Sequence, residues 1–382
     1  MSILRLGFIG GSCDSAIGYT HFVSTRMDNK FEICCACFST NKEINHKTAY
    51  LWDSNIRIYD DYKDLLKIEQ GKIDAICILT PTPTHKQILL DCIRYGYAVV
   101  VEKTLCRNLN EAKEIAAALQ DKNIFLAVIY NYTGYPMIRE LRYMIENGEF
   151  GDIFQINIEM PQESFICKND NGEVKIPQSW RLTDGIIPII SLDLGIHCHN
   201  LIYFLTHKKA LNVYSKYNGC GNFKNIIDNV NIFATYEDNI SVNMWFSKCA
   251  LGHRNGLKLR IFGSKSSCEW LQSNSEELIL NTQSGERIIK DRASPNLKIA
   301  SLARYNRFKA GHPQGFLEAF ANYYYDIAIS LVNFKNGIDS TSPYIFGLGE
   351  SKEGLLFFES ATLSAQKNNI VEIDYRNMEV DK

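Results

Sequence analysis

Apolar runs and amphipathic segments alternate along the first 130 residues of the chain. Short apolar runs typical of strands are separated by segments whose apolar residues recur at helical spacing. Several runs, such as "AICIL" and "VVV", are continuously apolar, which is typical of strands covered by helices on both faces. The rhythm predicts a parallel sheet with helices on both sides. The predicted strands are residues 4–9, 31–38, 56–59, 73–79, 98–101 and 124–129, and the predicted helices are residues 17–27, 42–52, 62–68, 85–94 and 109–120.

The rhythm changes after about residue 130. A predicted helix at residues 136–146 leads to a strand, "DIFQINIEM", and an irregular polar stretch ends before a helix that follows Pro188. From residue 210 to residue 292, strand-like runs follow one another without helices, which predicts a largely antiparallel sheet. Two helices close the chain. We therefore expect an α/β protein with one domain at residues 1–130 and an α+β domain with a large open sheet at residues 131–382, with a C-terminal helix able to pack back on the first domain.

A glycine-rich loop, "GFIGGSCDSAIGYTH", follows the first predicted strand. Glycines at a strand–helix junction let backbone N–H groups approach a pyrophosphate. The spacing is not G-x-G-x-x-G, so an ordinary turn is the alternative, but the position at the first junction favours a Rossmann dinucleotide-binding domain. Asp14 is expected to point away from the phosphates. The residues expected to contact the cofactor here are Gly10, Gly11, Ser12, Ser15 and Ile17.

The end of the second strand bears on the choice of cofactor. The residues there include Ser39, Thr40 and Lys42, with neither a carboxylate for ribose hydroxyls nor an arginine for a 2′-phosphate. Ser39 and Thr40 can hydrogen-bond a ribose, and Lys42 could neutralise a 2′-phosphate. NAD and NADP both stay open, with a slight preference for NAD.

Three later strands also end in polar groups. They run into "TPTPTH", into Glu102 and Lys103, and into "YNYTGYP". In a doubly wound sheet, ligands bind at the carboxyl ends of the strands. An exposed ion pair is the alternative for Glu102 and Lys103, but the convergence on the glycine loop's edge favours a site. The residues expected to contact the cofactor here are Thr80, Thr82, His85, Glu102 and Asn131.

Charge and cysteine content narrow the function classes. With 41 basic and 43 acidic residues, the net charge of −2 gives no electrostatic case for nucleic acid or an anionic membrane. No uninterrupted apolar window approaches membrane-spanning length, and the N-terminus reads as a strand rather than a signal peptide. Twelve cysteines in a chain of this kind are expected to be reduced, and the spacing of Cys34, Cys35 and Cys37 does not favour a metal site. We expect a cytoplasmic enzyme without a metal.

The segment "DLGIHCHN" carries the most specific chemistry of the second half. Asp193 and His197 are four residues apart, so on a helix they share one face. A histidine titrates near neutral pH and suits general-base catalysis. A core histidine is the alternative. His199 projects roughly 200° away on an ideal helix and is not expected to be a second base.

These motifs together resemble those of the Gfo/Idh/MocA oxidoreductases, over nearly the whole chain. The matching features are the glycine loop, "TPTPTH", "EKT" where the family has Glu-Lys-Pro, and "DLGIHCHN" for Asp-x-Gly-x-His-x-x-Asp, with Asn200 at the last position. A bacterial subgroup is closer still. Its matching features are the Ile-Gly-x-x-His end of the glycine loop at residues 17–21, "NYTGYPM", the pair Trp180 and Arg181, and "GHPQGFLEAFAN".

The resemblance implies hydride transfer between a nicotinamide and a secondary alcohol or ketone of a sugar, cyclitol or sugar derivative. It maps the catalytic roles onto Lys103, Asp193 and His197, and a lysine there stabilises negative charge on the reacting oxygen. Trp180 could stack on a sugar face, and Arg181 could bind a carboxylate or phosphate, although a packing tryptophan and a surface arginine are the alternative. The predicted substrate-binding residues are Tyr132, Trp180, Arg181, Asn200 and His312.

Three questions stay open at this level. Some relatives keep NAD bound and catalyse redox-neutral elimination, epimerisation or glycoside cleavage, and a non-catalytic dinucleotide-binding protein is a further alternative. Family members commonly associate through the open sheet, so we expect a homodimer or homotetramer. Thr104 replaces the family's proline, which either loosens the turn that aims Lys103 or is compensated by neighbouring packing.

Overall fold

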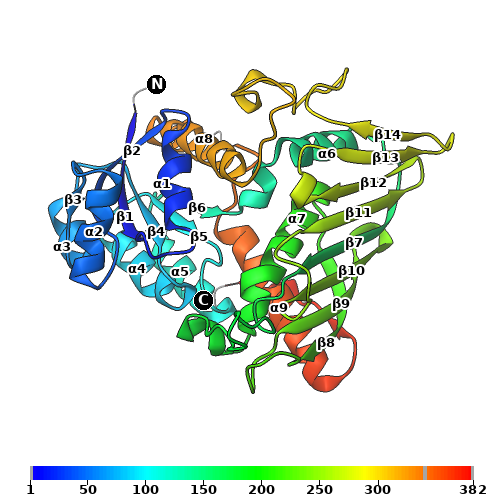
Figure 1. The fold of residues 1–382 in the computed structure, drawn as a ribbon, viewed down its shortest axis with the longest axis horizontal. Helices are drawn as coiled ribbons and strands as arrows, with labels where there is room; N and C mark the ends of the chain where they lie inside the picture. Colours follow the sequence, from blue (N-terminus) through cyan, green and yellow to red (C-terminus); the bar gives the residue numbers. More distant parts are fainter. Residues whose placement is uncertain (1–2, 339–341, 380–382) are drawn as a thin grey trace. The chain divides into compact units, whose positions relative to one another are not determined.

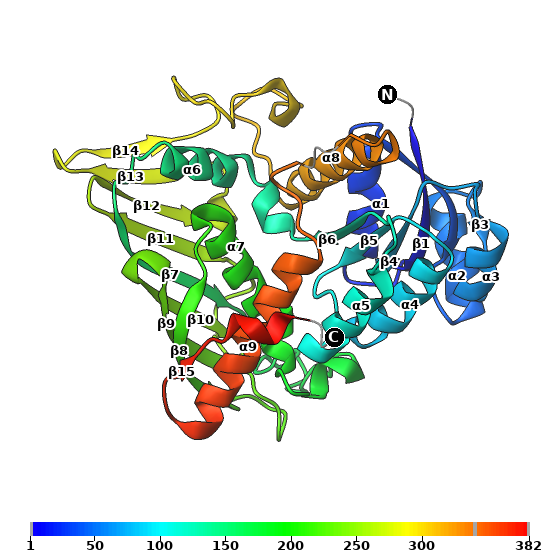
Figure 2. The same ribbon diagram turned by 180° about the vertical axis from the view of Figure 1, so that it is seen from behind.

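The computed structural model describes residues 3–338 and 342–379, which form two compact units (Figures 1 and 2). The first unit contains residues 3–134 together with residues 316–338 and 342–352. The second contains residues 135–315 and 353–379. Both units are therefore discontinuous in sequence. The predicted domains at residues 1–130 and 131–382 differ from these units mainly in residues 316–338 and 342–352. These belong to the first unit, whereas the prediction places them in the second domain.

The first unit is built on a six-stranded parallel sheet with the strand order β3-β2-β1-β4-β5-β6. Helices cover it on both faces (Figure 1), and every residue of β4 and β5 is buried, which explains their unbroken apolar sequences. The predicted Rossmann-type α/β fold is confirmed. The strands are β1 (Leu4–Gly10), β2 (Phe31–Cys37), β3 (Arg57–Ile58), β4 (Ala75–Leu79), β5 (Val99–Glu102) and β6 (Leu126–Ile129).

Local chemistry explains where the helices of this unit begin. Asn41, Asp61 and Asn108 each accept backbone N–H bonds at a helix start. The fourth helix begins at Thr82, three residues earlier than predicted, because Pro83 occupies the first turn, where a missing N–H costs little. The helices are α1 (Gly18–Arg26), α2 (Lys42–Trp52), α3 (Tyr62–Ile68), α4 (Thr82–Arg94), α5 (Leu109–Leu119) and α8 (Phe316–Lys335).

Helix α8 completes the first unit from far along the chain. It packs on α1 and buries Phe320, Tyr323 and Ile327. The Tyr323 hydroxyl donates to the carbonyl oxygen of Val128 in β6 at 2.6 Å. One of the helices that cover the parallel sheet therefore comes from residues about 200 positions beyond its final strand.

The second unit contains a nine-stranded sheet with the order β14-β13-β12-β11-β7-β10-β9-β8-β15. Only the β7–β10 pairing is parallel among the described strands of this sheet. The predicted, mainly antiparallel sheet is confirmed. The strands are β7 (Ile153–Pro161), β8 (Ala210–Asn218), β9 (Asn229–Tyr236), β10 (Ile240–Ser247), β11 (Lys258–Gly263), β12 (Ser266–Leu271), β13 (Leu278–Thr282), β14 (Arg287–Lys290) and β15 (Val371–Glu372).

Helices cover one face of this second sheet (Figure 2). They are α6 (Pro136–Glu146), α7 (Ile196–Thr206) and the part of α9 (Leu348–Lys367) that begins at Glu353. Alternate residues of β10, namely Val242, Met244 and Phe246, are buried, while Ser241 and Asn243 are exposed. This period of two is the pattern of a sheet with one covered face and one open face.

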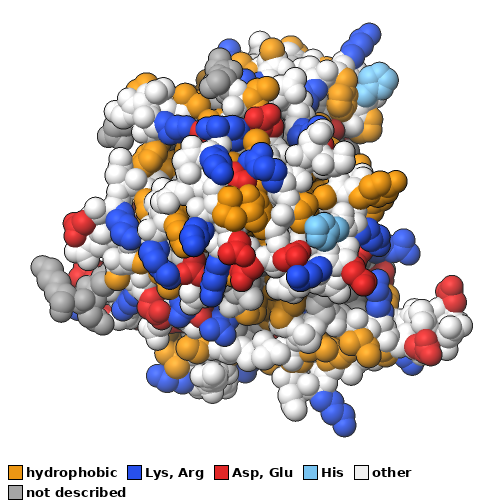
Figure 3. All heavy atoms as spheres, turned by 90° about the vertical axis from the view of Figure 1, so that its left-hand side faces the viewer, with side chains coloured by type: hydrophobic (Ala, Val, Ile, Leu, Met, Phe, Trp, Pro, Cys, Tyr) orange, Lys and Arg blue, Asp and Glu red, His pale blue; other side chains and the backbone are white. Residues whose placement is uncertain are grey.

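The surface of the protein carries a mixture of charged and apolar side chains, and most cysteines lie below it. Acidic, basic and apolar side chains are interspersed on the face drawn in Figure 3. Among the described residues, no helix is both long and apolar enough to cross a membrane. In β2, Cys35 and Cys37 are buried and Cys34 is partly exposed, and the described part of the chain contains no cluster of ligands suited to a metal ion.

Candidate functional site

The glycine loop after β1 has the conformation that its sequence requires. Gly10 and Gly11 have φ values of +85° and +76°, which side chains disfavour. A Cβ atom on Gly18 would lie 2.2 Å from the carbonyl oxygen of Gly11. The three glycines therefore let the backbone fold tightly between β1 and the start of α1. This close approach fits a loop that must lie against a pyrophosphate.

The three other predicted residues of the loop differ in burial. The Ser15 hydroxyl oxygen accepts from the N–H groups of Ile17 and Gly18 at 3.3 and 3.2 Å, directly before α1. Ser12 is buried and Ile17 is partly exposed. Asp14 is exposed, 3.9 Å from Lys47, and so points outward as expected.

Near the end of β2, the folded chain brings in carboxylates that the local sequence does not contain. Lys42, considered for a 2′-phosphate, pairs with Asp60 at 3.1 Å. Burial raises the pKa of the Cys37 thiol to about 11, with further contributions from the carboxylates of Asp61 and Asp60. Ser39 accepts from the N–H of Asn41 at 3.1 Å, and Thr40 is exposed. Two carboxylates therefore lie close to this strand end.

The parallel pairing brings three more strand ends to the same edge as the glycine loop. Thr80 follows β4, Glu102 ends β5 and Asn131 follows β6. The amide nitrogen of Asn131 is buried, and within the part of the chain that the structure describes it has no hydrogen-bond partner. A buried donor of this kind is costly unless something accepts from it. It fits a dinucleotide bound along this edge.

His85, predicted to contact the cofactor, joins two of these strand ends. Its ring is buried, with Nε2 2.7 Å from the carbonyl oxygen of Thr80 and Nδ1 2.8 Å from that of Thr104. Burial lowers the pKa of His85, despite the opposing effect of both carbonyls. Because both ring nitrogens face the backbone, His85 positions the loops after β4 and β5. Thr82 is buried at the start of α4.

The same contacts bear on Thr104. Its side chain is fully buried, its carbonyl oxygen lies against His85, and the Lys103–Thr104 peptide bond is cis. The burial of Thr104 and its contact with His85 favour the second of the two alternatives, in which neighbouring packing holds the turn that follows Lys103. Lys103 itself is partly exposed directly after β5.

Glu102 belongs to a buried chain of polar groups. Its Oε1 lies 3.0 Å from His21 Nε2, and its Oε2 accepts from the N–H of Lys103 at 3.1 Å. His21 Nδ1 lies 2.7 Å from the Tyr324 hydroxyl, which is also 3.3 Å from the Cys77 sulfur. Burial raises the pKa of Tyr324 well above 10, so the phenol stays neutral. The predicted cofactor residue Glu102 is thus fixed by α1 and α8.

In the second unit, Asp193 lies among cationic groups. Its Oδ2 accepts from Lys248 Nζ at 2.6 Å and from Arg181 Nη1. The Arg181 guanidinium stacks on the Trp180 ring, 4.3 Å from its centroid. Two cationic donors on one carboxylate stabilise its ionised form. Asp193 is therefore suited to orient a neighbouring group rather than to accept the reaction's proton.

The backbone at Asp193 differs from the predicted regular helix. Ser191–Gly195 forms a π-helical turn before α7 begins at Ile196. Such turns are rare and occur often at functional sites. A Cβ on Gly195 would lie 2.7 Å from the Phe358 ring, so the turn packs closely against α9. His197 follows in the first turn of α7 and is buried.

His199, which is not expected to be a second base, has buried partners at both ring nitrogens. It is buried with Nε2 2.7 Å from Glu353 Oε2 and Nδ1 3.1 Å from the Tyr236 hydroxyl. Of the remaining predicted residues, Asn200 and Tyr132 are buried. His312 is exposed, and its carbonyl oxygen accepts from Arg292 at 3.1 Å.

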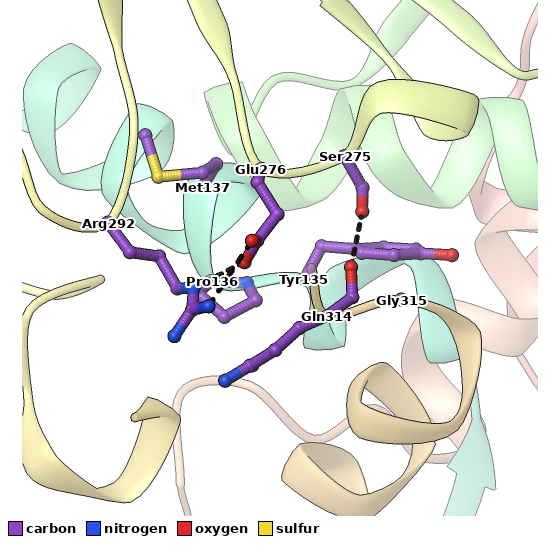
Figure 4. A pocket seen from close by; sticks show the side chains of 8 residues that line it. All are labelled: Tyr135, Pro136, Met137, Ser275, Glu276, Arg292, Gln314 and Gly315. Carbon is purple, nitrogen blue, oxygen red and sulfur yellow. Dashed lines mark hydrogen bonds and ion pairs between the residues drawn. The ribbon is translucent and has the colours of Figure 1, made fainter. Parts of the chain in front are cut away.

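A small pocket of the second unit lies apart from the predicted residues. Figure 4 shows its lining, in which Arg292 pairs with Glu276 and Ser275 donates to the carbonyl oxygen of Gln314. No residue predicted to act in catalysis or binding lines it. Its charged groups, Arg292 and Glu276, pair with each other, so nothing in its lining points to a ligand.

Two residues of these clusters were missed by reasoning from the sequence. Lys248 directly follows β10 and has the same parity as the buried residues Val242, Met244 and Phe246, so this spacing was an available signal. Tyr324 gave no such signal, because its partner His21 lies 303 positions earlier in the chain.

Comparison with protein families matches both halves of the chain. Residues 4–130 match the family described as an oxidoreductase family with an NAD-binding Rossmann fold, and residues 138–269 match the Gfo/Idh/MocA C-terminal domain. An uncharacterised oxidoreductase of Bacillus subtilis, YfiI, is 28% identical over 382 residues, covering 96% of each chain.

Solved structures share the fold. An inositol dehydrogenase homologue from Azotobacter vinelandii, complexed with NADH and myo-inositol, has a TM-score of 0.87 at 24% identity and covers 97% of this chain and 98% of its own. A levoglucosan dehydrogenase complexed with NADH has a TM-score of 0.82 at 19% identity and covers 98% and 100%.

Proposed function

Because the chain belongs to the Gfo/Idh/MocA family of oxidoreductases, with its NAD-binding Rossmann fold, we propose that it transfers hydride between a nicotinamide and a secondary alcohol or ketone of a sugar, cyclitol or sugar derivative. The observation that carries the proposal is the presence of Lys103 after β5 together with Asp193 in the π-helical turn before α7 and His197 in its first turn. The similar structures with bound myo-inositol and levoglucosan support a polyhydroxylated substrate.

NAD is the proposed cofactor rather than NADP. The carboxylates of Asp60 and Asp61 near the end of β2 would repel a 2′-phosphate, and Lys42 is already paired with Asp60. Gly10, Gly11, Ser12 and Asn131 are proposed to hold the dinucleotide, with Thr80, Thr82 and Glu102 along the same edge. Ser39 and Thr40 would face the ribose.

When bound, the nicotinamide accepts or supplies the hydride. In the oxidative direction, His197 is proposed to take the hydroxyl proton as hydride leaves the carbon, which yields a ketone. Lys103 would stabilise the negative charge that develops on the same oxygen. Asp193 would orient the His197 imidazole or hold the substrate hydroxyl. Tyr132, Trp180, Arg181, Asn200 and His312 remain the proposed substrate contacts.

Replacement of Lys103 tests the proposal. Lys103→Ala is expected to lower the rate by at least ~100-fold, because stabilisation of the reacting oxygen is lost, while NAD binding largely survives. Turnover is measured as nicotinamide absorbance and by mass spectrometry across sugars, inositols and sugar acids. Lys63→Ala, which removes an exposed lysine of α3, is the matched control.

Three results would contradict the proposal. Wild-type turnover in Lys103→Ala would remove the lysine from catalysis. Product formation without any absorbance change, with NAD retained through purification, would instead favour the redox-neutral alternative. Binding of NAD without turnover of any polyol would favour a non-catalytic role.

We also propose that the protein is cytoplasmic and forms a homodimer or homotetramer. All twelve cysteines are thiols, which suits a reducing compartment. The uncovered face of the second sheet exposes Phe233, a large apolar residue that association would cover. Light scattering at several concentrations measures the oligomeric state.

A further inference from the structure

Lys248 and Arg181 both bind one oxygen of Asp193, but their surroundings differ. The Lys248 side chain is 4% exposed, that of Asp193 is 13% exposed and that of Arg181 is 25% exposed. All three residues lie in the second unit.

Lys248 directly follows β10 and is held there by both backbone and side-chain contacts. Its backbone N–H donates to the carbonyl oxygen of Asp228 at 2.8 Å, and its own carbonyl oxygen accepts from the N–H of Phe165 at 2.9 Å. The ammonium lies 4.9 Å from the centroid of the Phe165 ring, a distance at which a cation and an aromatic face attract. Backbone and side chain are thus both fixed.

Arg181 is attached to a less regular part of the chain. It lies in a short 3-10 helix, Ser179–Leu182, in which no residue is buried. Its guanidinium rests on the neighbouring Trp180 ring. A side chain in this setting can leave Asp193 at lower cost than a buried lysine, because its charge is already partly hydrated.

We propose that Lys248 is a positioning residue that holds the Asp193 carboxylate in the catalytic arrangement, a role that Arg181 does not share. The proposal rests on the proposed function for its catalytic consequence. A buried ammonium needs a counter-charge, and a buried carboxylate needs donors, so each partner fixes the other. Asp193 lies in the π-helical turn, four residues before His197, where a displaced carboxylate would disturb the proposed base.

The test compares Lys248→Met and Lys248→Gln with Lys258→Met. Lys258 pairs with Glu269 between neighbouring strands of the same sheet, outside the cluster. Both Lys248 variants are expected to lose ~10–100-fold in kcat, since small misplacements of catalytic groups cost this much, while KM and the Kd for NAD change by less than ~3-fold. Lys258→Met is expected to keep wild-type kcat. A folded Lys248 variant with wild-type kcat would overturn the proposal.

A double-mutant cycle separates action through Asp193 from direct contact with substrate. In an Asp193→Asn background, Lys248→Met is expected to change kcat by less than ~3-fold, because residues that act through one another are not additive. A full additional loss in the double variant would overturn the positioning role.

Failure of the proposed function gives a different result. If the wild-type protein turns over no polyol, the same cycle is measured on urea midpoints. The single variants are then expected to lower the midpoint, and the double variant to lower it no further than the larger single effect. Additive shifts in the midpoint would show that Lys248 does not hold Asp193.

Discussion

At the scale of single residues, Lys103 and Asn131 point to the candidate site in two ways, one through the sequence and the other through burial. Lys103 could be assigned from its motif, because it directly follows a strand whose end lies at the dinucleotide edge. The folded chain buries the amide of Asn131 at the same edge, and in the described residues nothing accepts from its nitrogen. The cost of this buried donor makes Asn131 the residue whose effect should differ most between the free and NAD-bound states.

Asn131→Leu is expected to leave the thermal midpoint of the free protein unchanged or slightly higher, because it removes an unsatisfied donor. The same change should weaken NAD binding by about tenfold, which lowers the stabilisation by saturating NAD by about 1.4 kcal/mol. Thermal unfolding with and without NAD measures both effects. Asn110→Leu, at an exposed position of α5, is the control. An undiminished NAD-induced shift in Asn131→Leu would remove this residue from the cofactor site.

At the scale of elements, buried polar pairs fix contacts between segments that the pattern of apolar residues does not predict. The clearest is the contact of β3 with the end of α3, where Arg57 donates to both oxygens of Glu69 at 2.7 Å. The Glu69 side chain is fully buried, whereas that of Arg57 is half exposed. The Tyr59 hydroxyl donates to the same carboxylate at 2.6 Å. Hydrogen bonding from Arg57 lowers the pKa of Glu69 below its usual 4.5, against the opposing effect of burial.

A carboxyl group whose pKa is lowered by folding contributes stability that is fully present above its unfolded pKa. This stability is lost as the pH falls from the unfolded pKa through the lower folded pKa. Glu69→Gln is therefore expected to lower the free energy of unfolding by about 1–3 kcal/mol at pH 7. The difference from wild type should shrink as the pH falls below 4.5. Urea unfolding at several pH values measures it. Glu114→Gln, which breaks an exposed pair with Lys86, should show little effect at any pH.

At the scale of the whole molecule, the cysteines are distributed as small buried side chains. Seven of the twelve are buried and only Cys220 is exposed. Burial raises the pKa of the Cys77 and Cys268 thiols to about 12 and that of Cys34 to about 11. Thiols with raised pKa values react slowly, since the thiolate is the nucleophile.

A thiol-reactive chromogenic disulfide at pH 8 is expected to modify one cysteine rapidly in the native protein and all twelve after denaturation. Cys220→Ser should abolish the rapid phase, because Cys220 alone of the twelve is exposed. Fewer than twelve reactive thiols after denaturation without reductant would instead indicate disulfides.

The sequence by itself determined the fold class and the two kinds of sheet, and it predicted the glycine loop and the motif residues Lys103, Asp193 and His197. These follow from period, turn chemistry and position at strand ends, which are local properties of the chain. Only the tertiary structure showed that Lys248 binds Asp193, that Tyr324 supports His21 beside Glu102, and that both ring nitrogens of His85 face backbone carbonyls. These contacts join side chains far apart in sequence, and their geometry is set by packing between elements, which no local pattern records.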